Sequence, residues 1–382
     1  MIYLDSGATS IYKPREVFTA VRRAMTLGNP GRGGHKEALA AARELFNARD
    51  RIAAHFGAPS PECVCFFYNA TTAANIVIKT LVNPGETVML SDMEHNALRR
   101  PALALMRRAV KVDYFNGHGK KEEIVRSFHE KLKNKPALIA FVHRSNICPQ
   151  TLPVEELCAL AHKEGVLTVV DCAQSGGHLP LSLSKIGADA FILPSHKGLM
   201  GIAGAGVLIC SEKLKKALEE APTLLEGGSG IRSFEEGMPS LLPERLEWGT
   251  PALPAILSVA AGIEWIEKHT YDAIGEKLQG LFSAAKAGLA SIPQVRLHGM
   301  DGNPGKEGPL LFTVENSEQS TLAKRLYDEG VCLREGFHCA PLAHESIGTA
   351  QTGGLRVSFS VYNKKEDLDR FLMILEKSLR CS

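Results

Sequence analysis

The chain lacks the features that would mark it as a membrane, secreted or nucleic-acid-binding protein. No run of apolar residues is long enough to cross a bilayer, and the first residues show no basic region followed by an apolar stretch, so we expect no signal peptide. The formal net charge of +2 gives no reason to expect nucleic acid or an acidic membrane as a partner. Nine cysteines, an odd number scattered over 382 residues, fit reduced thiols better than a disulfide framework. We therefore expect a soluble cytoplasmic protein.

The apolar residues that are present indicate two domains of mixed helix and strand. They make up 45% of the chain, enough to bury a large core. Over residues 15–255, short apolar runs alternate with segments of helical periodicity, so we expect an α/β domain with a mostly parallel sheet flanked by helices. From residue 256 the pattern changes, and we expect residues 1–14 and 256–382 to form a smaller α+β domain.

Residues 167–210 carry the most informative pattern in the chain. Three short apolar runs, 167–170, 190–193 and 207–210, are typical of strands buried on both faces, as in a parallel sheet. Asp171 follows the first run directly, and Lys197 closely follows the second. Because ligands in open α/β sheets bind outside the carboxyl ends of the strands, we expect both side chains to face one crevice.

A lysine and a carboxylate at such a crevice favour a particular cofactor chemistry. The lysine suits a Schiff base with a carbonyl group, and pyridoxal 5'-phosphate (PLP) pairs such a lysine with an acid at its ring nitrogen. Taken singly, Asp171 could instead cap a helix and Lys197 could be a surface lysine. The neighbours Gln174, His196 and Gly198 favour the first interpretation, and the glycines after Lys197 lack the spacing of a dinucleotide-binding motif.

The segments Asp171-Cys-Ala-Gln174 and Ser195-His196-Lys197-Gly198 resemble the cofactor site of class V, fold-type I PLP-dependent enzymes, the group of cysteine desulfurases and selenocysteine lyases. The resemblance extends over nearly the whole chain. It implies a large PLP-binding α/β domain with a mostly parallel, seven-stranded type of sheet, and a smaller α+β domain. It also implies that Lys197 holds PLP covalently and moves the substrate's α-proton, and that Asp171 and Gln174 bind the cofactor.

A phosphate site is expected where the apolar run 63–67 leads into a helix at about residue 73. Free backbone N–H groups and the helix dipole favour an anion at such a start. Thr71 and Thr72 could simply cap the helix, whereas the resemblance implies that they bind the cofactor's phosphate.

Further contacts to the phosphate are implied by the same resemblance. Pro194 occupies the place where relatives commonly have a phosphate-binding serine, and proline has no N–H or hydroxyl to donate, so Ser195 or His196 is expected to compensate. Thr250, in the segment Gly249-Thr250-Pro251, resembles a residue that reaches the site of the neighbouring subunit. A plain turn is the alternative. The likeness implies a homodimer with shared active sites.

His95 and Asn146 follow two other apolar runs, 87–90 and 137–142. A lone histidine after a strand is more often a structural hydrogen-bonding residue than a catalyst. The resemblance implies, however, that His95 stacks on the pyridine ring and can move protons, and that Asn146 lies near the ring oxygen and the substrate. Pro149 stands where the family usually has glycine, which changes the shape of this loop.

A second candidate cluster lies near the C-terminus, where His338 and Cys339 are adjacent. A thiol beside a histidine can be deprotonated and nucleophilic. Cys339 could also be a buried filler, an incidental surface thiol, or a zinc ligand together with His338 and His344, although adjacent ligands rarely suit tetrahedral geometry. We expect no metal site.

The run Arg334-Glu-Gly-Phe-His-Cys339-Ala resembles the short-loop type of cysteine desulfurase, whose cysteine accepts sulfur as a persulfide. Phe337 replaces one histidine of the usual pair. Arg356 matches the residue that grips the substrate's carboxylate, a role that suits a planar bidentate donor.

Together these segments predict a PLP-dependent cysteine desulfurase that converts L-cysteine to L-alanine and passes sulfur through Cys339 to an acceptor protein. A selenocysteine lyase acting on L-selenocysteine would use the same residues. Two further hypotheses are an aminotransferase of the same class, in which Cys339 is incidental, and a non-catalytic sulfur carrier or scaffold.

Overall fold

The expected strands form a seven-stranded sheet at the centre of the larger part of the molecule. The computed structural model describes residues 1–31 and 33–380. The strand order is β2-β8-β7-β6-β5-β3-β4, with β2 (Val64–Phe67), β3 (Thr87–Ser91), β4 (Lys111–Phe115), β5 (Leu138–Val142), β6 (Leu167–Asp171), β7 (Ala190–Pro194) and β8 (Gly206–Cys210). The fold class predicted from the sequence, a mostly parallel sheet flanked by helices, is confirmed.

One strand departs from the predicted pattern. β8 runs antiparallel to both of its neighbours, β7 and β2, whereas the pairs from β7 to β4 are parallel. The parallel direction expected for the run 207–210 was therefore wrong. An apolar run indicates that a strand is buried on both faces, but it does not indicate the direction of the strand relative to its neighbours. A parallel neighbour of β7 would need a crossover helix, and the short link from β7 to β8 contains none.

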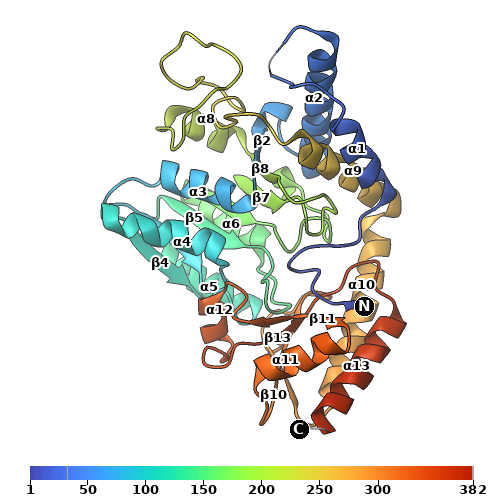
Figure 1. Cartoon of the computed structure of the whole chain (residues 1–382). Helices are drawn as coiled ribbons and strands as arrows, with labels where there is room; N and C mark the ends of the chain where they lie inside the picture. The colour runs from blue at the N-terminus through green and yellow to red at the C-terminus, as the bar shows by residue number, and fades with distance from the viewer. Residues whose placement is uncertain (32, 381–382) are drawn as a thin grey trace.

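Helices cover both faces of the sheet, so strands such as β2, β5, β7 and β8 are buried on both faces, whereas the edge strand β4 is partly exposed (Figure 1). Val88 and Leu90 of β3 pack into the core shared with α3, α4 and α8, whereas Met89 packs into the core shared with α5 and α6. These helices are α3 (Ala70–Leu81), α4 (Asn96–Leu105), α5 (Lys121–Leu132), α6 (Val154–Lys163) and α8 (Glu212–Glu220), with the shorter η1 (Pro61–Cys63), η2 (Met106–Arg108) and α7 (Leu183–Ile186) between them.

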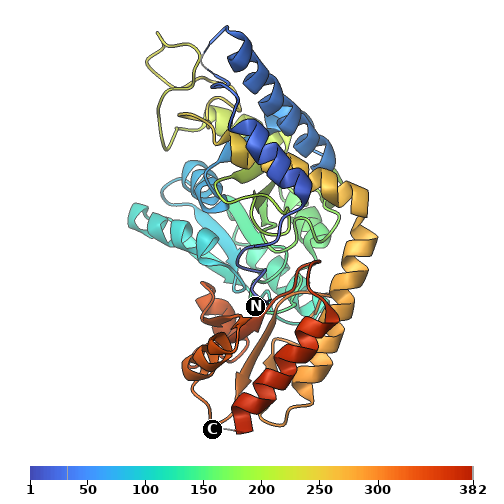
Figure 2. The ribbon, with the colours of Figure 1, turned by 45° about the vertical axis from the view of Figure 1, so that its right-hand side comes forward.

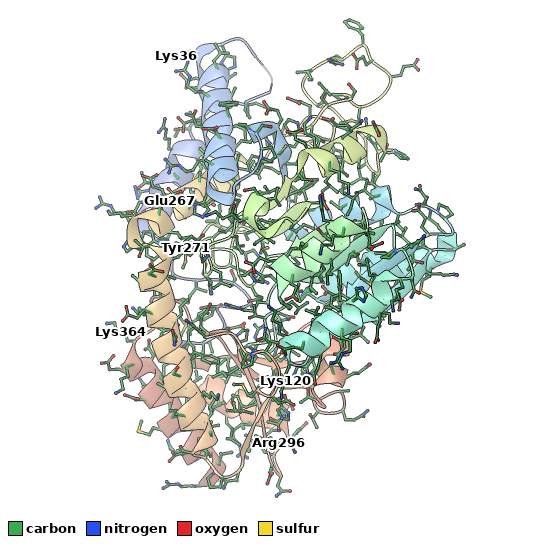
Figure 3. All side chains as sticks on the ribbon, turned by 180° about the vertical axis from the view of Figure 1, so that it is seen from behind. Lys36, Lys120, Glu267, Tyr271, Arg296 and Lys364 are labelled. Carbon is green, nitrogen blue, oxygen red and sulfur yellow. The ribbon has the colours of Figure 1, made fainter. Side chains whose placement is uncertain are left out.

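Three helices, α1 (Arg15–Ala24), α2 (Lys36–Phe56) and α9 (Leu253–His269), pack together beside the sheet. His35 caps α2 by accepting a hydrogen bond from the N–H of Ala38, and Gly57 ends the helix with φ 64°. The predicted domain boundary after residue 255 falls inside α9. The chain then turns at Thr270 into α10 (Tyr271–Ala290), which extends into the smaller part of the molecule; Glu267 and Tyr271 mark this junction in Figure 3.

The smaller part is built on a four-stranded antiparallel sheet of order β12-β13-β10-β9. Its elements are β9 (Val295–His298), β10 (Leu310–Val314), α11 (Gln319–Asp328), β11 (Val331–Cys332), β12 (Arg334–Gly336), α12 (Pro341–Ser346), β13 (Gly354–Val357) and α13 (Lys365–Arg380). The N-terminal strand β1 (Ile2–Tyr3) pairs with β11, so the first residues join this part, as Figure 2 shows. Among the described residues, no helix is long and apolar enough to cross a membrane.

Candidate active site

Asp171 and Lys197 lie at the carboxyl ends of neighbouring parallel strands, β6 and β7. Asp171 is 5% exposed, and its Oδ1 accepts a hydrogen bond of 2.8 Å from the N–H of Ala173. Burial raises the pKa of Asp171, while the Ala173 N–H and the positive charge of Lys197 act in the opposite direction. The structure thus brings together the two residues that the sequence placed at one crevice.

The Lys197 amine is prepared to act as a nucleophile. Burial lowers its pKa to about 8; the charges of Arg356 and Arg334 act in the same direction, and those of Asp171 and Asp5 oppose them. A large share of this amine is therefore neutral near pH 8, and only the neutral amine can attack a carbonyl group.

His95 caps helix α4, the structural role that a lone histidine after a strand often plays. Its Nδ1 accepts a hydrogen bond of 3.0 Å from the N–H of Ala97, so the ring proton of the neutral imidazole is on Nε2. Burial lowers the pKa of His95 to about 4, and the charge of Lys197 contributes to this shift. His95 is therefore neutral at physiological pH, and its cap role leaves Nε2 available.

Gln174 and Asn146 link the site to segments that are distant in sequence. Gln174 Nε2 donates to the carbonyl of Gly7 at 2.9 Å, and Asn146 Nδ2 donates to the carbonyl of His338 at 2.7 Å. The Oδ1 atom of Asn146 is buried without a hydrogen-bond partner among the described residues. An unpaired acceptor of this kind is expected to be satisfied by a bound molecule or water.

Arg356 is almost completely buried, at 1% exposure, and is held from two sides. Its Nη2 donates to Asp5 Oδ1 at 2.6 Å, and its Nη1 donates to the carbonyl of Asn146 at 2.8 Å. Its Nε has no hydrogen-bond partner in the part of the chain that the structure describes. Sequence reasoning missed Asp5, which is 351 residues away from Arg356.

Cys339 lies on a loop of the smaller part that touches the start of helix α4. The carbonyl of Cys339 accepts a hydrogen bond of 2.7 Å from the N–H of Asn96, the residue after His95. Its side chain is exposed, which excludes the buried-filler alternative, and its Sγ is 3.9 Å from Nη2 of Arg334. The loop leads into α12, since Pro341 suits a first helical turn.

Thr71 and Thr72 lie in the first turn of α3 and are not its cap. The cap is Asn69, whose Oδ1 accepts from the N–H of Thr72 at 2.9 Å and from its hydroxyl at 3.1 Å. This rules out the simple capping alternative for the threonines. It also explains why α3 begins at Ala70, earlier than predicted. The N–H groups of Thr72 and Ala73 already donate to Asn69, whereas those of Ala70 and Thr71 precede these bonds and can bind an anion.

The other predicted phosphate contacts are more dispersed. The Ser195 hydroxyl donates to the carbonyl of Ile202, so its proton is already engaged. His196 Nδ1 is 3.0 Å from the Thr9 hydroxyl. Thr250 is exposed, accepts a hydrogen bond from Asn29 at 3.3 Å, and lines the same groove as Thr72.

The region around Lys197 also contains a buried ionic group that the sequence did not reveal. Arg144 forms an ion pair with Glu307, and His178 Nδ1 is 3.5 Å from the other Glu307 oxygen. With Lys197 and Gln174 these residues line a cavity of about 20 Å³, enough for about one water molecule. Arg144 and Glu307 come from the larger and smaller parts, and their pairing across 163 residues left no local pattern to detect.

The zinc alternative is not supported by the geometry. His338 and His344 contact each other, and no group of three or more His, Cys, Asp or Glu side chains within residues 1–31 and 33–380 could hold a metal ion.

Comparison with known proteins identifies the family of the chain. The family model "Aminotransferase class-V" matches residues 2–371. The chain therefore belongs to the aminotransferase class-V family.

Individual relatives share its full length. The protein named "Probable cysteine desulfurase 2" from Mycobacterium leprae is 32% identical over 97% of this chain and 90% of its own. A cysteine desulfurase from Escherichia coli O127:H6 is 30% identical over 99% of this chain and 93% of its own. The apo structure of a cysteine desulfurase from Thermococcus onnurineus NA1 superposes with a TM-score of 0.89, at 27% identity, covering 100% of this chain and 95% of that one.

Proposed function

We propose that the protein is a PLP-dependent cysteine desulfurase, which takes sulfur from L-cysteine, leaves L-alanine and passes the sulfur through Cys339 to an acceptor protein. The observation that carries this proposal is the hydrogen bond between the N–H of Asn96 and the carbonyl of Cys339. It ties the backbone of Cys339, whose thiol is exposed, to the residue that follows His95. His95 is in turn close enough to Lys197 for the charge of the lysine to contribute to the lowered pKa of the histidine.

The residues at this crevice fit PLP. Lys197 would hold its aldehyde carbon, Asp171 its ring nitrogen and His95 one face of its ring. The unpaired Oδ1 of Asn146 offers a polar contact. The remaining contacts are expected from Gln174, Thr71, Thr72 and His196, and from Thr250 of the partner subunit. Ser195 is left out, because its hydroxyl donates to Ile202 and its N–H to Ala205. When bound, PLP supplies an acceptor for the electron pair released at the substrate's α-carbon.

The protein's own groups then have separable tasks. Arg356 binds the substrate's carboxylate through its unpaired Nε side, and Lys197 as a neutral amine takes the α-proton. The Cys339 thiolate attacks the substrate's sulfur; the bond between sulfur and the β-carbon breaks, and its electron pair stays with the carbon fragment. That fragment takes up protons and leaves as alanine, and Cys339 carries the sulfur as a persulfide. Because Cys339 is exposed, an acceptor can reach the persulfide.

A homodimer is part of the proposal. Thr72 and Thr250 line a groove of about 1070 Å³. Its rim includes Phe46, Leu225 and Leu241, which are 55%, 50% and 55% exposed. Exposed apolar side chains gathered around a groove are typical of a contact surface. Light scattering of the purified protein tests this; a monomer at micromolar concentration would contradict it.

A cytoplasmic location is proposed on the same basis as in the sequence analysis. The eight cysteines within the described residues are free thiols, as expected in a reducing compartment.

The decisive experiment incubates the PLP-loaded protein with L-cysteine and, separately, L-selenocysteine, and measures alanine, sulfide and selenide with and without a reductant. We expect alanine and sulfide from cysteine, and loss of both in Cys339→Ala with unchanged absorbance of the bound cofactor. Undiminished alanine formation by Cys339→Ala would reject the role of the thiol. A strong preference for selenocysteine would identify a selenocysteine lyase, and formation of a keto acid would identify an aminotransferase.

A further inference from the structure

Three side chains behind the Cys339 loop form a hydrogen-bonded row. Thr349 Oγ1 is 2.7 Å from His344 Nδ1, and His344 Nε2 is 3.3 Å from His338 Nδ1. His338 Nε2 is 3.2 Å from the carbonyl oxygen of Arg334. All three side chains are buried, with His338, His344 and Thr349 at 3%, 0% and 1% exposure.

The direction of every proton in this row follows from its last member. A carbonyl oxygen can only accept, so His338 Nε2 must carry a proton and donate it to Arg334. In a neutral imidazole the other nitrogen is then an acceptor, so His338 Nδ1 accepts from His344 Nε2–H. His344 Nδ1 in turn accepts from the Thr349 hydroxyl. Burial lowers the pKa of His338 to about 3 and that of His344 to about 4, which supports two neutral rings.

This arrangement leaves no free lone pair on His338. Each of its ring nitrogens is engaged, one as donor and one as acceptor, and neither partner is the thiol. Arg334, by contrast, approaches the Cys339 sulfur, with its Nη2 at 3.9 Å. A histidine next to a cysteine in sequence is therefore not a base for it here.

The row instead supports the backbone conformation of His338 and Cys339. His338 and Cys339 both have positive φ, 50° and 57°, a conformation that side-chain-bearing residues rarely adopt and that needs support from the surroundings. The carbonyls of these residues are fixed from the other side of the crevice by Asn146 Nδ2 and the N–H of Asn96, both at 2.7 Å. The two imidazoles fix the same loop through the hydrogen bond from His338 Nε2 to the carbonyl of Arg334.

We propose that three residues, His338, His344 and Thr349, are positioning residues. Their hydrogen bonds all run in one direction, from the Thr349 hydroxyl to the Arg334 carbonyl, and hold Cys339 in its conformation of positive φ with the thiol exposed. In this proposal His338 does not deprotonate the thiol. The kinetic part of this inference rests on the proposed desulfurase function. The part that concerns the thiol can be measured without substrate or turnover.

The test uses the holoenzyme with four variants. His338→Gln and His344→Gln keep an N–H near the position of Nε2 but remove the imidazole, whereas His344→Leu and Thr349→Val remove a member of the row. His55→Leu is the matched control, because this histidine is also inaccessible but pairs with Glu267 and Tyr271 away from the loop.

Two quantities are read. The first is the pH profile of iodoacetamide alkylation at Cys339, followed on its own peptide by mass spectrometry. The second is the separation of kcat from KM for L-cysteine. We expect His338→Gln to leave the alkylation midpoint unchanged within about 0.3 pH units, because a positioning donor does not set the thiol pKa. We expect His344→Leu and Thr349→Val to lower kcat about tenfold with KM within about twofold, since a misplaced nucleophile slows the reaction of bound substrate. His344→Gln should recover most of kcat.

A rise in the alkylation midpoint of about one pH unit or more in His338→Gln would make His338 the base and overturn the proposal. Parental kcat and alkylation rate in both His344→Leu and Thr349→Val would show that the row has no role. If His344→Leu does not fold, Thr349→Val and His338→Gln decide the question. If the parent protein forms no alanine, the proposed function fails, while the alkylation data still test the position of the thiol.

Discussion

The guanidinium of Arg356 is paired with the carboxylate of Asp5 at 2.6 Å, although the two residues are 351 positions apart. Arg356 lies in β13 and is 1% exposed, whereas Asp5 belongs to the N-terminal segment, and its side chain is 20% exposed. The pair neutralises the cation that would bind the substrate's carboxylate while leaving its Nε without a partner among the described residues.

Replacing Asp5 by Asn should destabilise the cofactor-free protein. The change leaves a buried guanidinium without its counter-charge, and such losses cost about 3–5 kcal/mol when both partners are buried. Because Asp5 is partly exposed, we expect about 2 kcal/mol. Urea unfolding measures the difference. Glu156→Gln is the control, since Glu156 pairs with Lys121 at the surface, where both side chains are exposed, and the change should cost below about 1 kcal/mol. Equal effects of the two substitutions would contradict this expectation.

The same variant should respond more strongly to a carboxylate ligand. With Asp5 neutralised, the bound carboxylate supplies the missing negative charge, so L-alanine should raise the melting temperature of Asp5→Asn more than that of the parent. Differential scanning fluorimetry with L-alanine and with L-alaninamide, which lacks the carboxylate, separates this effect from general binding. A similar shift with both compounds would mean that Arg356 does not grip the carboxylate.

Lys197 should reduce the stability of the cofactor-free protein. Its pKa is lowered from 10.5 to about 8, so the unfolded chain binds more protons than the folded one between these values. Stability therefore rises with pH from about 8 to 10.5, and the full penalty applies below pH 8. Lys197→Met should remove about 2–3 kcal/mol of this penalty at pH 7, after allowance for partial exposure. Urea unfolding at pH 7 and pH 10 tests this; a variant less stable than the parent at pH 7 would contradict it.

Sequence reasoning succeeded where neighbouring residues decide the structure. Strands β6 and β7 were expected because a short run of apolar residues is a local signal, and the structure places them at Leu167–Asp171 and Ala190–Pro194. The crevice followed, since parallel strands bring Asp171 and Lys197 to the same edge of the sheet.

What sequence reasoning missed depends on contacts between distant segments. The direction of β8 is set by tertiary packing, and the pairs Arg356–Asp5 and Arg144–Glu307 join residues far apart in the chain. The role of His338 was suggested by its adjacency to Cys339, but the ring contacts His344. Adjacency in sequence does not fix where a side chain points.

The start of α3 offers a direct test of the phosphate site. Asn69→Asp keeps an oxygen that can accept from the N–H and hydroxyl of Thr72, so the helix cap is retained, but it adds a negative charge where an anion would bind. We expect stability within about 0.5 kcal/mol of the parent and affinity for PLP lowered about tenfold or more, measured by equilibrium titration of the apoprotein. Asn69→Ala is the complement: it should lose about 1 kcal/mol of stability with a smaller change in affinity. Unchanged affinity in Asn69→Asp would place the phosphate elsewhere.

His95→Asn separates the two roles of this residue, because asparagine is also a good helix cap but has no ring and does not titrate. The pKa of His95 is lowered from 6.5 to about 4, so the unfolded chain binds more protons between these values, and the stability of the parent falls as pH drops from 6.5 to 4. In the variant, the free energy of unfolding should therefore depend less steeply on pH, by up to about 1.4 kcal/mol per pH unit, the contribution of one titrating proton. Unfolding curves at pH 4.5, 5.5 and 6.5 can resolve this difference. At pH 7 the stability of the variant should be close to that of the parent, because the cap on α4 is kept. Alanine formation should fall about a hundredfold, since no imidazole remains to face the pyridine ring of PLP and move protons. Loss of folding at pH 7 would show that the ring itself stabilises the domain, and parental activity would remove His95 from the site.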